Sequence, residues 1–181
     1  MLDINRTSTQ KHDYMLDIEE SPGVYMLHLV LDQLRSLKIG RHGKYNFSPG
    51  EYLYVGSALG PGGLRARLGR HLRGSENRRW HIDWLRPVTK VKGYFYTATS
   101  ENLECSWNQF LSGLPGASIP VPGFGASDCR NKPSPCAAHL VWFGSGVDIN
   151  LIRDNLPAGG RSQVVYQKFT TFFQPDDDNI E

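Results

Sequence analysis

The segment GVYMLHLVL, residues 23–31, has the alternation of a buried β-strand. Its side chains fall into two interleaved sets, and both sets are almost wholly apolar, so we expect a strand that is covered on much of both faces. A second strand is predicted at residues 51–58, EYLYVGSA, where Tyr52, Tyr54 and Gly56 share one face. The chain therefore places a tyrosine, Tyr25 or Tyr54, on each of two predicted strands.

An arginine-rich helix is predicted after the second strand. Pro61-Gly62-Gly63 predicts a turn that ends the strand region, and the leucines that follow recur at helical spacing: Leu64, Leu68 and Leu72. Arg67 and His71 are also four residues apart, so both can face one place at the edge of the core. A guanidinium offers a planar set of donors that matches phosphate, and a phenol can orient or deprotonate water. These residue types suit the binding and hydrolysis of a phosphodiester.

Further elements follow from the same patterns. We expect a short strand at 37–40 with a turn at 41–44, a short helix at 80–85 and strands at 91–99 and 137–143. A helix that opens at Ser100-Glu101 should bury Leu103, Trp107 and Leu111, and 113–135 should form a long loop. The resulting division is a polar lead-in at 1–20, a domain at 21–145 and a C-terminal extension at 146–181 with an acidic, disordered end. The apolar part of that extension, near Val164 and Phe169, could dock on this domain or on a protein partner.

Composition narrows the class of protein. The 181 residues, 39% of them hydrophobic, suffice for one domain with a packed core. No apolar run approaches the roughly 18 residues that cross a bilayer, and the N-terminus lacks the apolar stretch of a secretory signal. Three cysteines, an odd and small number, argue against a disulfide framework and favour a reducing compartment. We therefore expect a cytoplasmic protein with no membrane partner.

Charge is unevenly distributed along the chain. The formal net charge is only +2, yet residues 61–92 hold nine Lys and Arg against two acids, a local charge of +7, which leaves −5 for the remainder. A basic centre in an otherwise acidic chain is typical of a phosphate-binding face, although a solvated charged helix would give the same pattern. The candidate nucleic-acid contacts are Arg65, Arg70, Arg73, Arg78, Arg79 and His81. His81 and Asp83 could equally form structural hydrogen bonds.

The combined motifs resemble the GIY-YIG nucleases. They are Gly23-Val24-Tyr25, Tyr54-Val55-Gly56, Arg67 with His71, Trp80 to Leu85, Glu104-Cys105, Gly123 to Cys129 and Cys136 to Leu140, and the later blocks look like the Uri-type branch, a poorly characterised group often classed as a domain of unknown function. The resemblance covers about residues 21–145. It implies an α+β fold with a small antiparallel three-stranded sheet packed by helices, and with the two tyrosines on neighbouring strands. The long interval between those tyrosines requires an inserted hairpin or loop, which the Uri-type branch also has.

The resemblance also implies an activity and a site. Similar proteins hydrolyse DNA phosphodiesters with one divalent ion, usually Mg²⁺ or Mn²⁺. Carried over by position, the catalytic residues are Tyr25, Tyr54, Arg67, His71 and Glu104, with Glu104 as the metal ligand. Glu101 is the alternative ligand, but Glu104 neighbours the buried stripe of its helix and Glu101 suits the exposed first turn. Either tyrosine could be the base. The substrate could be single-stranded, double-stranded or branched DNA, or it could be RNA.

Two other function classes compete with this hypothesis. A domain of the same fold could bind nucleic acid through its basic and aromatic residues without cleaving it. Alternatively, Cys105, Cys129, Cys136 and His139 could hold a structural Zn²⁺ in an interaction module. Their spacing matches no standard finger or ribbon, and Cys105 lies on a predicted helix that need not approach the others. Buried thiols are therefore the favoured interpretation of the cysteines.

Overall fold

The computed structural model describes residues 18–129, 135–144 and 146–173. An antiparallel sheet forms its centre, with strand order β6-β7-β4-β1-β5-β8. These strands are β1 (Gly23–Leu31), β4 (Gly50–Ser57), β5 (Lys90–Ala98), β6 (Ala117–Ser118), β7 (Leu140–Phe143) and β8 (Val165–Phe173). The other two strands, β2 (Arg35–Ile39) and β3 (Gly43–Phe47), pair only with each other. This hairpin is the insertion expected between the two tyrosine strands.

The α+β class is confirmed, but the expected three-stranded sheet is wrong. The sheet has six strands because both edges of the central β4-β1-β5 unit are extended: β7 and then β6 on the β4 side, and β8 on the β5 side. Unpaired edges leave backbone donors and acceptors without partners, and the added strands satisfy them. The extension beyond residue 146 therefore docks on this domain through β8. The predicted disordered tail and most of the predicted lead-in lie outside the described residues.

The sequence pattern predicts three of the helices that the described residues form. The arginine-rich helix is α2 (Gly63–Arg73), followed by α3 (Ile82–Leu85), α4 (Glu104–Ser112) and α5 (Ile149–Asn155). Two of them differ from expectation: α4 begins at Glu104 rather than at Ser100, and α5 was not predicted. None of the helices in the described part of the chain combines the length and apolar character that a membrane crossing would need.

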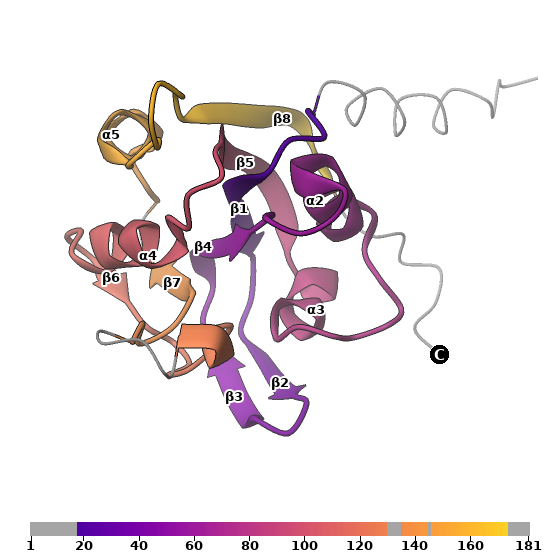
Figure 1. Ribbon diagram of the computed structural model, residues 1–181. Helices are drawn as coiled ribbons and strands as arrows, with labels where there is room; N and C mark the ends of the chain where they lie inside the picture. Colours follow the sequence, from indigo (N-terminus) through magenta and orange to yellow (C-terminus); the bar gives the residue numbers. More distant parts are fainter. Residues whose placement is uncertain (1–17, 130–134, 145, 174–181) are drawn as a thin grey trace, which may run out of the picture.

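The two faces of the sheet carry separate cores. Tyr25, Leu27 and Leu29 of β1 pack with α2, α3 and the β2-β3 hairpin, whereas Val24 and Met26 pack with α4 and α5. Figure 1 shows α2 and α3 beside the central strands on one side and α4 on the other. The prediction that β1 is buried on both faces is confirmed, because its alternate side chains enter two different cores.

Candidate functional site: a pocket at the end of the tyrosine strands

A pocket of about 180 Å³ lies where β4 ends. It is lined by Tyr25, Tyr54, Gly56, Ser57, Arg67, Arg79, Trp80, His81, Glu104, Gly125, Ser127 and Asp128. Four of the five expected catalytic residues are in this set, and they come from β1, β4, α2 and α4. At a liquid-water share of about 30 Å³ per molecule, the space would hold about six waters, which is adequate for a phosphate group with an attacking water.

The register of β1 and β4 brings the two tyrosines together. Leu27 lies opposite Tyr54 and Tyr25 lies opposite Gly56, so the tyrosines are diagonal neighbours on one face. The Tyr25 ring lies over Gly56. A Cβ at residue 56 would come within 2.5 Å of the Tyr25 phenol oxygen, so this approach requires glycine.

Both phenols are protonated in this environment. Burial, and then the nearby Glu104 carboxylate, raises the pKa of Tyr25 above its ordinary range, and Arg67 offsets only part of this. Burial also raises the pKa of Tyr54 well above its ordinary value, with Tyr25 and Glu104 adding to the shift. The two side chains are therefore hydrogen-bonding phenols and not preformed phenolates.

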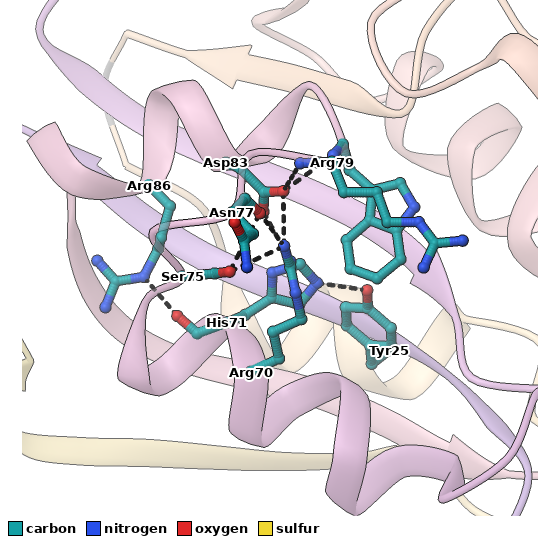
Figure 2. Close-up of polar contacts among 9 residues, drawn as sticks. Tyr25, Arg70, His71, Ser75, Asn77, Arg79, Asp83 and Arg86 are labelled. Carbon is teal, nitrogen blue, oxygen red and sulfur yellow. Dashed lines mark hydrogen bonds and ion pairs between the residues drawn. The ribbon is translucent and has the colours of Figure 1, made fainter.

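His71 lies behind Tyr25 and does not line the pocket. Its Nε2 atom is 2.7 Å from the phenol oxygen of Tyr25, and only 2% of the residue is exposed. Burial lowers the pKa of His71 to about 3, so the imidazole is neutral at physiological pH. The buried Arg86 donates from Nε to the His71 carbonyl at 2.9 Å, which satisfies a carbonyl at the C-terminal end of α2 (Figure 2).

Arg67 reaches the pocket from the middle of α2. Its guanidinium carbon lies 4.6 Å from the centroid of the Trp80 ring, a cation–π distance that limits the positions the side chain can take. Among the residues that the structure describes, no carboxylate forms an ion pair with Arg67. A bound phosphate would therefore not have to displace an acidic partner.

Glu104 is the first residue of α4, and its carboxylate lines the pocket. Its Oε1 atom is 3.3 Å from Nδ1 of His139, but the two do not align as a hydrogen bond, and that buried nitrogen has no hydrogen-bond partner. Glu101, the alternative ligand, is exposed and lies outside the pocket lining. Of the two glutamates that the sequence offers as metal ligands, Glu104 therefore lines the pocket and Glu101 does not.

Among the expected nucleic-acid contacts, Arg65 and Arg70 form ion pairs with carboxylates. Arg70 donates to both carboxylate oxygens of Asp83, at 2.8 and 2.9 Å, and the same carboxylate accepts from the backbone N–H groups of Arg79 and Trp80 (Figure 2). This network holds the loop before α3 and with it the Trp80 ring. Arg65 donates to the Ile18 carbonyl at 2.8 Å and to Glu20 at 2.8 Å, which ties α2 to the chain that precedes β1.

The other four expected contacts are divided between two cavities. Arg79 and His81 line it, and His81 Nδ1 accepts the Gly125 N–H at 3.0 Å. Exposed Arg78 lies over the Trp84 ring at 5.9 Å. Exposed Arg73 lines a second cavity, of about 480 Å³, that also reaches His71.

Trp80, Ser127 and Asp128 are among the pocket residues that the sequence does not single out as site residues. Trp80 supports Arg67, and Ser127 and Asp128 add a hydroxyl and a second carboxylate to the lining. The block from Gly123 to Cys129 is one of the motifs of the sequence, but the pattern does not assign its individual side chains to the site. Polar residues within that block were the available signal.

The cysteine set converges beside the pocket. Cys105, Cys129, Cys136 and His139 each offer a ligand atom, and these four atoms lie within 4.8 Å of one another, close enough to hold a metal ion. All three cysteines are thiols. The expectation that Cys105 need not approach the others is therefore wrong, because α4 begins against the segment that carries Cys129, where the two sulfurs are 3.4 Å apart.

Comparison with known proteins gives a family but no characterised relative. No curated protein and no solved structure matches the chain. A family model does match, over residues 24–155, which include the whole pocket and the cysteine set. The chain therefore belongs to the family described as "Domain of unknown function DUF123".

Proposed function

We propose that this protein is a metal-dependent endonuclease of the GIY-YIG type that hydrolyses DNA phosphodiester bonds. One observation carries the proposal: Tyr25, Tyr54, Arg67 and Glu104, which are up to 79 positions apart in the chain, line one pocket of about 180 Å³. Two phenols, an arginine with no acidic partner among the described residues and a carboxylate form a set suited to phosphoryl chemistry.

The reaction needs a phosphate-binding group and a positioned water. Arg67 donates hydrogen bonds to the non-bridging phosphate oxygens, where negative charge increases in the transition state. The water oxygen attacks phosphorus, a phosphorus–oxygen bond forms, and the bond to the leaving sugar oxygen breaks. Tyr54, the diagonal neighbour of Tyr25, orients the water or the phosphate through its protonated phenol.

Tyr25 and His71 offer a route for the proton that water loses. Tyr25 accepts that proton as it passes its own to Nε2 of His71, 2.7 Å away. A concerted transfer avoids a buried phenolate, which the raised pKa of Tyr25 disfavours. It also gives His71, outside the pocket lining, a function through Tyr25. Burial, which lowers the pKa of His71 to about 3, opposes the imidazolium that results, and the nearby Asp83 carboxylate offsets part of that cost.

The donors near Glu104 fit a hard divalent cation. Mg²⁺ and Mn²⁺ prefer oxygen ligands, and Mg²⁺ keeps most of its waters, so one or two carboxylates suffice. Glu104 would hold the ion, and Asp128 and Ser127 line the same pocket. When bound, the ion supplies positive charge that stabilises the transition state.

A non-catalytic nucleic-acid-binding domain is the second candidate. Arg79, which lines the pocket, and its chain neighbour Arg78 are exposed and would attract a nucleic-acid backbone whether or not it is cut. DNA is the expected partner of either function, and the same surface would accept RNA. Salt-sensitive binding with no cleavage in any divalent metal would favour this candidate.

The test is cleavage of end-labelled single-stranded, duplex and branched DNA in Mg²⁺, in Mn²⁺ and in EDTA. Tyr54→Phe, Arg67→Ala and Glu104→Gln should each lower the rate about 100-fold or more, as loss of a transition-state contact does. Glu101→Gln and Arg153→Ala are the matched controls, because Glu101 lies outside the pocket and Arg153 pairs with Asp154 on α5. Parental rates in all three pocket variants would refute the assigned roles, and no cleavage of any substrate by the parent would refute the activity.

A further inference from the structure

The cysteine set has the composition of a closed zinc site. It joins three segments of the chain: Cys105 on α4, Cys129 at the end of a short 3₁₀ helix at Ser127–Cys129, and Cys136 with His139 before β7. Cys129 and His139 are buried, and Cys105 and Cys136 are partly buried. Three thiolates and an imidazole are among the ligand sets that Zn²⁺ takes in structural sites.

The distances within the set suit one tetrahedral ion. The Cys105 and Cys129 sulfurs are 3.4 Å apart, and the Cys129 sulfur is 3.2 Å from Nε2 of His139. With zinc–sulfur bonds of about 2.3 Å, tetrahedral ligands lie about 3.8 Å from one another. A disulfide would need sulfurs about 2.05 Å apart, so the thiols are spaced more as metal ligands than as a covalent pair.

His139 connects this set to the candidate active site. His139 is only 1% exposed, and its ring turns Nε2 toward the cysteines. The other ring nitrogen, Nδ1, has no hydrogen-bond partner and faces Glu104 Oε1 at 3.3 Å. A zinc ligand bound through Nε2 carries its proton on Nδ1, and such a proton is commonly donated to a carboxylate. Metal binding would therefore give both the orphaned nitrogen and Glu104 a defined partner.

We propose that Cys105, Cys129, Cys136 and His139 bind one structural Zn²⁺, and that the bound His139 positions Glu104 by donating a hydrogen bond from Nδ1. The zinc site stands independently of the nuclease proposal, whereas the effect on catalysis rests on it. The ion would fix several parts of the pocket wall at once. Glu104 precedes Cys105, Ser127 and Asp128 precede Cys129, and His139 leads into β7, which pairs with the Tyr54 strand.

Metal analysis of the full-length protein tests the site. Protein purified without chelators and in reductant should contain about one zinc per chain. Replacement of the zinc by Co²⁺ should give the thiolate charge-transfer and tetrahedral d–d absorption bands. Cys129→Ser and His139→Ala should lose most of the metal, and His42→Ala, a histidine outside the set, should retain it. Absence of zinc binding even after Zn²⁺ is added to reduced protein, or isolation of a Cys105–Cys129 disulfide in its place, would overturn the proposal.

The positioning of Glu104 by His139 has to be tested with a measurement that an unfolded variant would not reproduce. His139→Cys keeps four zinc ligands but removes the Nδ1 donor, so zinc content should be retained while the Mg²⁺ concentration needed for half-maximal cleavage rises about 10-fold or more. In ¹⁵N-histidine spectra of the zinc-loaded parent, Nδ1 of His139 should carry the proton, and its shift should change in Glu104→Gln, which should itself retain zinc. A bare Nδ1, or an unchanged Mg²⁺ requirement in His139→Cys, would contradict positioning. A zinc-loaded protein that shows the Nδ1 proton and its Glu104→Gln shift but cuts no DNA would leave this inference standing and remove the nuclease proposal.

Discussion

The phenol oxygen of Tyr25 lies 2.7 Å from Nε2 of His71, and this contact joins a pocket residue to a buried, neutral imidazole. The sequence placed both residues at the site. In the structure only the phenol lines the pocket, and the histidine lies behind it.

Burial of neutral His71 should make stability pH-dependent. Its folded pKa, about 3, lies below the unfolded value of 6.5, so only the unfolded chain takes up a proton as pH falls from 6.5 toward 3. Stability is therefore lost on acidification, by about 2 kcal/mol between pH 6.5 and 5. Urea unfolding at several pH values measures this slope, and His71→Asn should flatten it. If His71→Asn lost stability with falling pH as steeply as the parent, a group other than His71 would be responsible for the pH dependence.

The close approach of Tyr25 to Gly56 should make that glycine irreplaceable. Gly56→Ala places a Cβ within 2.5 Å of the phenol oxygen, so the ring must move, at a cost of about 1–3 kcal/mol in unfolding free energy and with loss of cleavage. Gly113→Ala is the control, because its φ is −86° and the nearest atom to an added Cβ is 3.5 Å away. Thermal melts and cleavage rates compare the two. Equal melting temperatures and cleavage rates in the two variants would mean that the Tyr25 ring can move away from the added Cβ at no cost.

The Arg70–Asp83 pair should control the position of Trp80. Asp83→Asn leaves a partly buried Arg70 without its carboxylate, and we expect a loss of about 3 kcal/mol in stability with weaker DNA binding, because Trp80 supports Arg67. Denaturant midpoints and binding titrations measure the two effects. The exposed Arg78→Ala should weaken DNA binding alone. A stable Asp83→Asn protein with normal DNA affinity would exclude this network from the site.

Glu51 should stabilise the fold away from the site. His28, and then Lys92, holds the pKa of this carboxyl at about 2, below the ordinary 4.5, and burial opposes them. The contribution is present above pH 4.5 and is lost as pH falls toward 2, so Glu51→Gln should cost about 2 kcal/mol at pH 7 and little near pH 2. The exposed Asp154→Asn should leave the unfolding midpoint unchanged. A Glu51→Gln penalty that persists at pH 2 would point to packing instead.

The individual elements were largely predictable because their signals are local. The alternation of side chains over residues 23–31 predicted β1, and the leucine spacing predicted α2. The long interval between Tyr25 and Tyr54 predicted an insertion, which is the β2-β3 hairpin. Element ends were less predictable. The helix that was expected to open at Ser100 begins at Glu104, where no side-chain cap marks the start.

The amino-acid sequence by itself determined the strands, the arginine helix and the residue types that the proposed phosphate chemistry would use, since hydrophobic period and backbone preference act over a few residues. Tertiary structure alone decided which distant groups meet. It put Glu104 and not Glu101 in the pocket lining, paired Arg70 with Asp83, set His71 behind Tyr25, added three strands to the sheet and brought Cys105 to Cys129. Such contacts depend on the packing of whole helices and strands across long stretches of chain, and no local pattern encodes that packing.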